Sequence, residues 1–206
     1  MIGMLILHAT RDCGQTPRIV FAFEEIGAPW RVVWHDGGYF IDNFGGPGPL
    51  LEDGELRLFY SGPIIRHAAR TIAGARLLPS GPAQLAMVEQ WMDFYLIGFR
   101  VPIITLAQQR AQPADRKDVV LIERETAGLH RVLATLERQL ALGEYIAGEF
   151  SAADVTYSAL SMLPRLGIDL AAFPRTEQYL ARIAKRPAWV RSQSRLDAAR
   201  AETASG

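Results

Sequence analysis

The chain has 206 residues, and its 22 basic and 22 acidic side chains give a formal net charge of zero. This balance provides no electrostatic attraction to nucleic acid or to an anionic membrane, so we expect neither as a partner. The single cysteine, Cys13, excludes an internal disulfide, a Cys-x-x-Cys redox pair and a cysteine-rich zinc site. The four histidines show no ligand spacing, so we expect no metal.

The sequence gives no sign of export or of membrane insertion. The first residues lead into an apolar strand without the pattern of a signal peptide. The most apolar later stretch, Trp91 to Leu106, is interrupted by Asp93 and Arg100, and a bilayer requires roughly twenty uninterrupted apolar residues. These features predict a cytoplasmic protein.

The first predicted elements are a short strand, Met4–Leu7, and a helix that follows a turn around Cys13. Thr16 is a suitable N-cap, Pro17 fits the first turn of a helix, and Gly27 is a suitable C-cap. Between these ends, apolar residues recur at helical spacing, namely Ile19, Val20, Phe23 and Ile26.

Cys13 lies in this strand-to-helix turn, where the positive end of the helix dipole favours the nucleophilic thiolate. Arg11 and Arg18 favour a thiolate as well, whereas Asp12 opposes it. The alternative is that Cys13 is a small buried hydrophobic residue, as free cysteines commonly are. The local charges leave both interpretations open.

The next residues predict a strand at Trp30–Trp34, a glycine-rich loop over 36–48 and a third strand that begins at Leu50. Asp53-Gly54 is a hairpin signal leading into a fourth strand, and Ser61 is a suitable cap for the following helix. The resulting order, β-α-β-loop-β-β-α, describes a thioredoxin-like layer.

The remainder of the chain predicts an all-helical domain. Proline, glycine and serine cluster in a linker at 76–83, which separates a domain at 1–75 from a domain at 84–206. Four helices are predicted at about 82–110, with a bend near Gly98 and Pro102, and at 114–142, 152–166 and 175–185. The tail after Arg195 is expected to be helical at first and frayed at its end. We therefore predict an α/β thioredoxin-like N-terminal domain followed by an all-α C-terminal domain.

This arrangement resembles the cytosolic glutathione transferase family over nearly the whole chain. The segment PRIVFAFEEIGAPW around Arg18 is similar to the family's first helix and the turn that follows it. Asn43–Pro49 is similar to the family's Asn-Pro-x-Gly-Lys-Val-Pro, and FSAADVTYSAL, which holds the capping box Ser151–Asp154, is similar to its capping motif. Cys13 matches the nucleophile position of cysteine-type classes, with omega-like or beta-like features, although the residues after it do not follow their Cys-Pro-Phe pattern.

The resemblance implies that glutathione is the co-substrate. Pro49 would be a cis-proline that lets Gly48 present its backbone N–H and C=O to the cysteinyl part of glutathione. Ser61 would bind the γ-glutamyl carboxylate at a helix N-terminus. Tyr60 stands where the family usually has Glu or Gln, and Pro47 stands where a lysine is common.

Two glutathione reactions follow from the resemblance. If Cys13 is the nucleophile, the protein transfers thiols through a mixed disulfide with glutathione, which is the reaction we favour. If Cys13 only packs, the protein conjugates glutathione to a small hydrophobic electrophile, with Thr10 as the nearest hydroxyl that could assist. Trp91 and Tyr95 would line the substrate pocket, although aromatic residues at helical spacing are also typical of a core.

Other roles are compatible with the same fold. The residues at Tyr60 and Pro47 favour a non-catalytic binding or scaffold protein, whereas Ser61 and Pro49 argue against one. An isomerase or dehalogenase that uses glutathione as a cofactor would keep the same site. From the family we also expect a homodimer with a role in detoxification.

Overall fold

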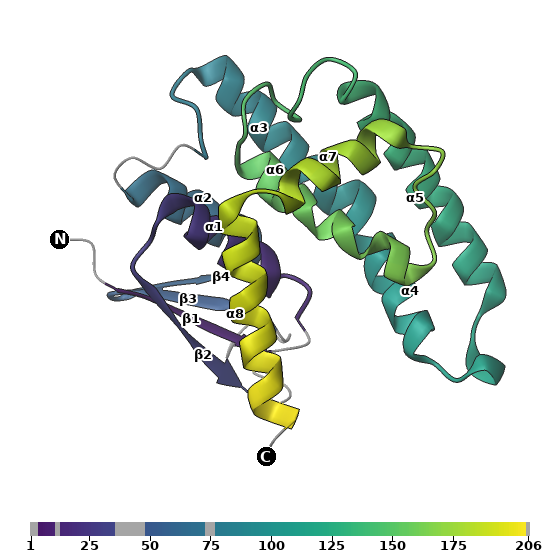
Figure 1. The fold of residues 1–206 in the computed structure, drawn as a ribbon, viewed down its shortest axis with the longest axis horizontal. Helices are drawn as coiled ribbons and strands as arrows, with labels where there is room; N and C mark the ends of the chain where they lie inside the picture. The colour runs from purple at the N-terminus through teal and green to yellow at the C-terminus, as the bar shows by residue number, and fades with distance from the viewer. Residues whose placement is uncertain (1–3, 11–12, 36–47, 73–76, 205–206) are drawn as a thin grey trace. The chain divides into compact units, whose positions relative to one another are not determined.

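The computed structural model describes residues 4–10, 13–35, 48–72 and 77–204. The chain divides into two compact units, one made of Met1–Pro79 with Ala184–Gly206 and the other of Ser80–Ile183 (Figure 1). The first unit contains a four-stranded sheet, and the described part of the second is built from helices and loops. The predicted combination of an α/β part and an all-α part is confirmed.

The sheet of the first unit is mixed, with strand order β2-β1-β3-β4. Along β1, alternate residues are fully buried, beginning with Leu5 and Leu7, which is the alternation expected when one face of a sheet covers a core. β1 pairs parallel with β2 and antiparallel with β3, and β3 pairs antiparallel with β4. The strands span β1 (Leu5–Thr10), β2 (Trp30–His35), β3 (Leu50–Asp53) and β4 (Leu56–Phe59).

Local turn signals place most ends of these elements correctly. Gly27 ends α1 (Thr16–Ile26) in the left-handed conformation with φ +65°, and Gly54 turns the β3–β4 hairpin with φ +61°. Both N-cap predictions, however, are one residue late. The N-cap of α1 is Gln15 instead of Thr16, because the backbone already turns there, at φ −89° and ψ −28°.

The second N-cap correction concerns α2 (Ser61–Thr71). Tyr60 is the N-cap residue and Ser61 is the first residue of the helix. The reason is the backbone of Tyr60, which has the non-helical angles φ +65° and ψ 146°, so that the helix starts at the next residue. The glycine-rich loop predicted over 36–48 lies outside the described residues except for Gly48.

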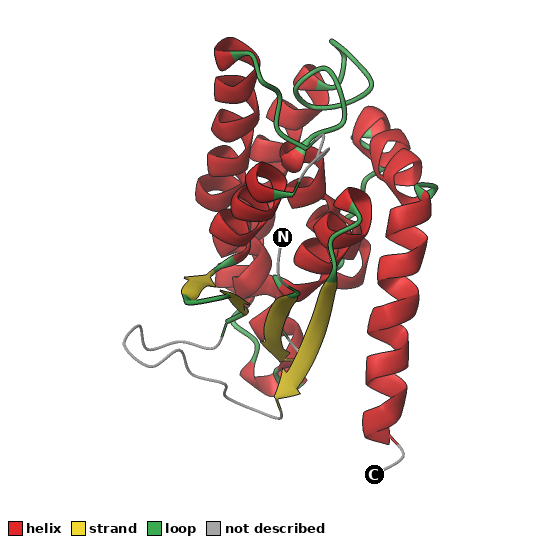
Figure 2. Ribbon diagram, turned by 90° about the vertical axis from the view of Figure 1, so that its left-hand side faces the viewer, coloured by secondary structure: helices red, strands yellow, loops and turns green. Residues whose placement is uncertain are grey.

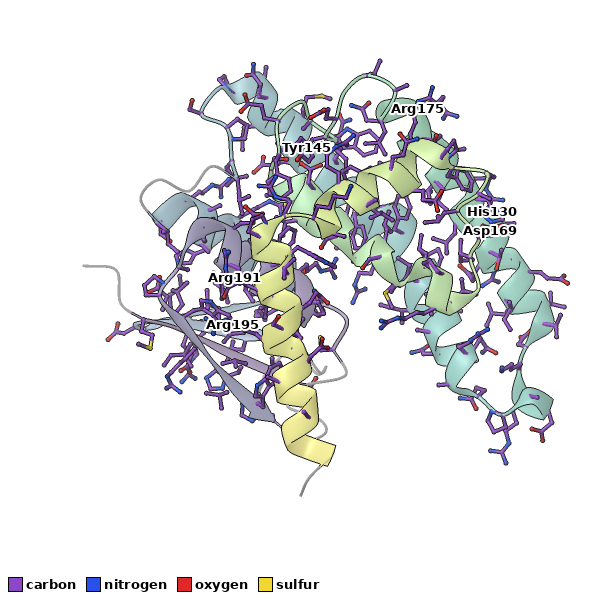
Figure 3. All side chains as sticks on the ribbon, in the orientation of Figure 1. His130, Tyr145, Asp169, Arg175, Arg191 and Arg195 are labelled. Atoms are coloured by element: carbon purple, nitrogen blue, oxygen red, sulfur yellow. The ribbon has the colours of Figure 1, made fainter. Side chains whose placement is uncertain are left out.

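The C-terminal helix α8 (Pro187–Ala204) belongs to the first unit, where it contacts α1. Trp189 packs edge-to-face on Phe21, with ring centroids 5.2 Å apart. Arg191 and Arg195, one turn apart on α8 (Figure 3), each place Nε 2.8 Å from a carboxylate oxygen of Glu24. The predicted division of the chain put this segment with the second domain, whereas the structure packs it against the first helix.

The second unit begins with a helix of three parts. Figure 2 shows the helices of both units in red. The predicted bend near Gly98 is a π-helical turn, and the absence of a side chain at Gly98 lets α5 approach closely. A Cβ built there would lie 3.0 Å from Val132 Cγ1. The helices of this unit are α3 (Pro82–Phe94), the π-turn η1 (Tyr95–Phe99), α4 (Arg100–Ala111), η2 (Ala114–Arg116), α5 (Val119–Gln139), α6 (Ala152–Tyr157), η3 (Ser158–Leu166) and α7 (Pro174–Ala184). No helix in the described part of the chain is both long and apolar enough to cross a membrane.

The predicted capping box at the start of α6 is present and fully buried. Asp154 Oδ2 accepts a 2.8 Å hydrogen bond from Ser151 N–H, and Oδ1 accepts from Ile146 N–H and from the Tyr179 hydroxyl. Burial raises the pKa of Asp154 to about 6, and these hydrogen bonds to the carboxylate act against that rise. Asp154 therefore organises the core of the helical unit, as the capping motif predicts.

Candidate active site

The topology of the first unit brings three segments to one edge of the sheet. β1 ends at Thr10, while antiparallel β3 begins at Leu50 opposite His8, so Gly48 and Pro49 approach the sheet at the end of β1. β4 pairs Phe59 with Leu50 and therefore ends at that same edge. The turn after β1, the segment before β3 and the segment after β4 thus meet, and they carry the predicted catalytic and glutathione-binding residues.

A tight turn holds Cys13 between β1 and α1. The Cys13 N–H donates to the carbonyl of Thr10 at 3.2 Å, and the Thr16 N–H donates to the carbonyl of Cys13 at 3.1 Å. The side chain of Thr10 is buried, whereas that of Cys13 is partly exposed. The thiol therefore stands at the N-terminal end of α1 with access to solvent, which is the position that nucleophilic chemistry requires.

Ser61 presents two hydrogen-bond donors to a single oxygen atom. Its backbone N–H and its hydroxyl donate to Gln15 Oε1, at 3.1 and 3.3 Å. Ser61 is only 3% exposed, and its N–H is one of those at the start of α2 that have no partner within the helix. Two convergent donors at a helix N-terminus form a subsite suited to a carboxylate oxygen.

Tyr60 is the one non-glycine residue with a positive φ in the described part of the chain. A side chain held in this region costs roughly 1–3 kcal/mol of conformational energy, and such residues cluster at ligand sites. Tyr60 is 43% exposed, and its ring lies edge-on to that of Phe59. This backbone leads directly into Ser61, whose N–H donates to Gln15 Oε1.

Gly48 and Pro49 are both buried immediately before β3. The described residues contain no cis peptide bond, so the bond between Gly48 and Pro49 is trans and the cis-proline prediction is wrong. Trans is the intrinsically preferred isomer of a residue–proline bond. Pro47 and the rest of the Asn43–Pro49 motif before Gly48 lie outside the described residues.

The predicted substrate-pocket residues lie in an aromatic cluster of the helical unit. Trp91 and Tyr95 are both buried, and each packs edge-on to Tyr157, with ring centroids 6.1 and 5.5 Å apart. Trp91 Nε1 and the Tyr157 hydroxyl are buried without a hydrogen-bond partner, and burial holds the pKa of Tyr157 well above its usual range. Within the helical unit these rings form core, and their contact with a substrate stays a prediction.

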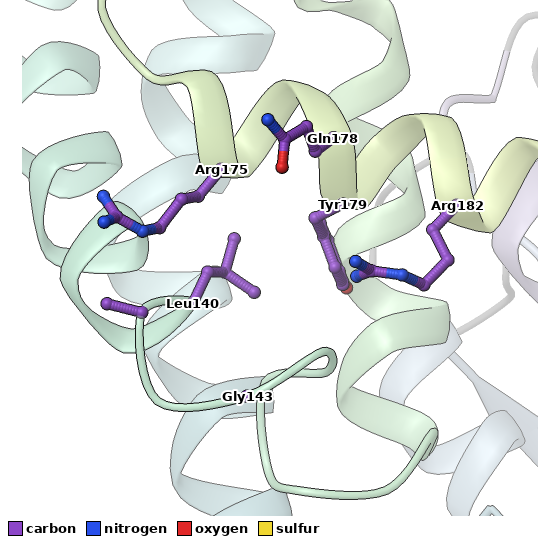
Figure 4. A pocket seen from close by; sticks show the side chains of 7 residues that line it. Leu140, Gly143, Arg175, Gln178, Tyr179 and Arg182 are labelled. Carbon is purple, nitrogen blue, oxygen red and sulfur yellow. The ribbon is translucent and has the colours of Figure 1, made fainter.

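Two cavities of the helical unit are lined by other residues. One, of about 180 Å³, lies between α7 and the loop after α5 (Figure 4), and Arg175, Gln178 and Arg182 line its α7 side. The other, of about 480 Å³, lies between the π-turn with α4 and α5, and its lining includes Ile97, Val101, Arg124 and Arg131. The described residues hold no group of three side chains suited to bind a metal ion.

Gln15 is the site residue that the sequence did not reveal. It stands between Cys13 and Thr16 at the start of α1, and its side chain makes no capping bond to that helix. Its partner Ser61 is 46 residues away, so only the fold shows the contact. The one available signal was its place in the turn that carries the cysteine.

Known proteins resemble this chain over nearly its full length. No family model matches the sequence. Glutathione S-transferase F12 of Arabidopsis thaliana is 27% identical over 216 residues, which covers 92% of this chain and 96% of that protein. Glutathione S-transferase GstB of Escherichia coli K12 is 25% identical over 199 residues, which covers 90% of this chain and 95% of that protein.

Solved structures agree with these relatives. The theta class glutathione S-transferase of Xanthomonas axonopodis pv. citri, with glutathione bound, matches with a TM-score of 0.81 at 25% identity, covering 93% of this chain and 97% of that one. Glutathione S-transferase III in its apo form matches with a TM-score of 0.79 at 27% identity, covering 93% and 96%. Ure2p in complex with glutathione shares the fold, with a TM-score of 0.84 at 18% identity and 93% of each chain covered. In sequence and in fold, this chain is therefore similar to glutathione S-transferases over nearly its full length.

Proposed function

We propose that this protein is a glutathione-dependent transferase that binds glutathione at the sheet edge where β1 and β4 end. The observation that carries the proposal is the pair of Ser61 donors that converge on one oxygen. The proposal is supported by relatives named as glutathione S-transferases and by a structural neighbour that has glutathione bound. Ser61 receives the γ-glutamyl carboxylate, and the dipole of α2 favours the negative charge.

The rest of the tripeptide extends along the same edge. Gly48 and Pro49 lie beside its cysteinyl part, and Tyr60 holds the backbone of Ser61 in place. A further cation stands at the first turn of α2, because Arg66 Nη1 lies 3.1 Å from where a Cβ on Gly62 would be. This guanidinium adds positive charge close to the carboxylate subsite.

Cys13 is the nucleophile of the favoured reaction. Its thiolate attacks the glutathione sulfur of a mixed disulfide, forms a Cys13–glutathione disulfide and releases the other thiol as the thiolate. A second glutathione thiolate then attacks that disulfide, giving oxidised glutathione and restoring Cys13. One cysteine is sufficient, because glutathione supplies the two electrons that reduce the original disulfide.

The experiment that separates the reactions compares two substrates. The protein is assayed with glutathione and either the mixed disulfide of glutathione and 2-mercaptoethanol or an aryl halide such as chlorodinitrobenzene. Turnover of the disulfide at a rate that exceeds aryl halide conjugation is expected. The reverse order would assign the protein to conjugation, with Thr10 as the hydroxyl nearest the sulfur and a small hydrophobic electrophile as the second substrate.

The second candidate is a non-catalytic binding protein of the same fold. The observation that favours it is Tyr60, because a phenol cannot accept a hydrogen bond from the glutathione ammonium as a carboxylate does. Weak or absent turnover of both substrates, together with measurable glutathione binding, would select this candidate.

The proposal extends to the assembly and its location. The protein acts as a homodimer in the cytoplasm and takes part in detoxification, as the resemblance to glutathione transferases implies. The partner subunit covers the groove between η1, α4 and α5, where Ile97 is 81% and Val101 54% exposed. Cell fractionation tests the location, and the dimer is tested below.

A further inference from the structure

Gln15 holds the position in which the proposed site places a ligand. Its Oε1 accepts both Ser61 donors, from the backbone N–H at 3.1 Å and from the hydroxyl at 3.3 Å. A backbone N–H can only donate, so the amide oxygen of Gln15 is the atom that faces Ser61. An amide oxygen and a carboxylate oxygen present similar lone pairs to such donors.

The N-cap residues of α1 and α2 do not cap their own helices through their side chains. Gln15 is the N-cap of α1, yet its side chain makes no capping bond there. The side chain of Tyr60, the N-cap of α2, makes none either. The Gln15–Ser61 contact therefore joins two helix starts, and Gln15 supplies the acceptor for the first N–H of α2 that no residue of α2 supplies.

We propose that Gln15 sets the affinity of the proposed site for glutathione, because its side chain occupies the γ-glutamyl carboxylate subsite in the ligand-free protein and must be displaced by the ligand. The inference rests on the proposed function, because it takes Ser61 to be the carboxylate subsite. One acceptor fits between the two donors, so Gln15 and the ligand carboxylate exclude each other.

Charge decides which ligand displaces the glutamine. A hydrogen bond to an ionised oxygen is about twice as strong as one to a neutral amide oxygen, so the glutathione carboxylate wins the Ser61 donors. A thiol that lacks the γ-glutamyl carboxylate cannot replace the hydrogen bonds between Ser61 and Gln15, so displacement of Gln15 would not strengthen its binding. Gln15 thus lowers the affinity for glutathione moderately and leaves the affinity for thiols without the γ-glutamyl group unchanged.

Substitution of Gln15 changes glutathione affinity in a predictable order. Gln15→Ala removes the competitor, and glutathione is expected to bind about tenfold more tightly than to the wild type. Gln15→Glu places a charged competitor against Ser61 and is expected to weaken binding by about tenfold. Gln15→Asn keeps an amide but shortens the side chain by one methylene, so it should behave like the alanine variant and replaces it if that variant fails to fold.

The test is calorimetric titration of the wild type and the three variants with glutathione and, separately, with cysteinylglycine, which lacks the γ-glutamyl group. Tighter glutathione binding by Gln15→Ala with unchanged cysteinylglycine binding supports the inference. Equal or weaker glutathione binding by that variant, while the wild type binds, overturns the inference and leaves the proposed function standing. An equal increase in the affinity of Gln15→Ala for both ligands overturns the assignment of Gln15 to the carboxylate subsite. Binding of glutathione by none of the proteins removes the proposed function and this inference together.

Discussion

Cys13 is the residue on which the reaction type depends. Cys13 is partly exposed in the β1–α1 turn, where its backbone N–H donates to the carbonyl of Thr10. Cys13→Ser is expected to abolish turnover of the mixed disulfide, by at least about 10³-fold, because a serine hydroxyl cannot form the enzyme–glutathione disulfide. Glutathione affinity should change by less than about threefold, since Ser61 and not Cys13 holds the carboxylate.

Steady-state assays and calorimetry on Cys13→Ser check this prediction, and Thr10→Val is the matched control. The control should keep disulfide turnover, because Thr10 is buried and forms no bond to the reacting sulfurs. Full turnover by Cys13→Ser would contradict the nucleophile assignment and favour conjugation.

The raised pKa of Asp154 is expected to make the unfolding free energy depend on pH. Burial raises its pKa from an ordinary value of 3.8 to about 6, so between these values the folded protein holds a proton that the unfolded chain releases. The group's contribution is fully present below pH 4 and is lost as the pH rises through 6. Two pKa units correspond to about 3 kcal/mol of unfolding free energy.

Urea unfolding of the wild type and Asp154→Asn at several values from pH 4.5 to 7.5 measures this effect. Asparagine does not titrate, so the stability advantage of the wild type over the variant should shrink as the pH rises. An advantage that grows with pH would show that the hydrogen bonds to the carboxylate outweigh its burial.

Sequence patterns at single positions predict features that depend on neighbouring residues, and they do not predict contacts between distant segments. They correctly placed Cys13 in a turn and Ser151–Asp154 in a capping box, because both features depend on neighbouring residues. They did not distinguish core from pocket at Trp91, since burial depends on which helices pack around it. Gln15 was not predicted as a site residue because its partner, Ser61, lies on another helix.

At the scale of elements, a carboxylate from another helix caps the start of α7. Glu137 of α5 accepts hydrogen bonds of 2.9 Å from the backbone N–H groups of Arg175 and Thr176, and a third from the Thr176 hydroxyl. Burial alone would raise the pKa of Glu137, but these hydrogen bonds and the Arg175 charge hold it below its usual range. The side chain thus caps the first turn of α7 in place of a local residue.

Glu137→Gln removes the charge and one acceptor, and it is expected to lower the unfolding free energy by about 1–2 kcal/mol at pH 7. Because the pKa is lowered in the folded protein, this stabilisation is present above the ordinary glutamate pKa and is lost as the pH falls through the lowered value. Urea unfolding at pH 7 and pH 3.5 checks both effects. The exposed Glu123→Gln on the same helix should cost less than about 0.5 kcal/mol, and an equal cost at the two sites would refute the capping role.

Element boundaries were predictable where one residue type determines the backbone. Gly27 and Gly54 have positive φ angles, so their positions in the sequence marked a helix end and a hairpin. The start of α2 was misplaced by one residue because Tyr60 adopts a positive φ, which no local pattern of side chains predicts. The π-turn at Tyr95–Phe99 was anticipated only as a bend near Gly98.

At the scale of the molecule, the strand order of the first unit determines which segments meet at the candidate site. The first strand and the hairpin at Asp53-Gly54 were predicted from the sequence, and the pairing of β3 with β1 and with β4 brings the ends of β1 and β4 together. The packing of α8 on α1 was not visible. It includes ion pairs such as Arg191 of α8 with Glu24 of α1, which are 167 residues apart, and α8 carries few apolar residues.

The proposed dimer is tested at the groove of the helical unit. Ile97→Glu places a charge among its exposed apolar side chains and is expected to convert a dimer to a monomer, because a buried unpaired charge opposes association. Light scattering after size exclusion measures the mass at several concentrations. Leu142→Glu is the control, since Leu142 is equally exposed, at 80%, outside this groove. A wild type that is monomeric, or a dimer that survives Ile97→Glu, would contradict this interface.

The most direct test of the whole account is the affinity of the protein for reduced glutathione. Calorimetric titration of the wild type beside Ser61→Ala should show micromolar to millimolar binding that the variant weakens by at least about tenfold, because the carboxylate loses the hydroxyl donor. Circular dichroism of the two proteins confirms that both are folded. The absence of binding by the wild type at millimolar glutathione, or equal binding by the two proteins, would contradict the claim that this sheet edge is a glutathione site.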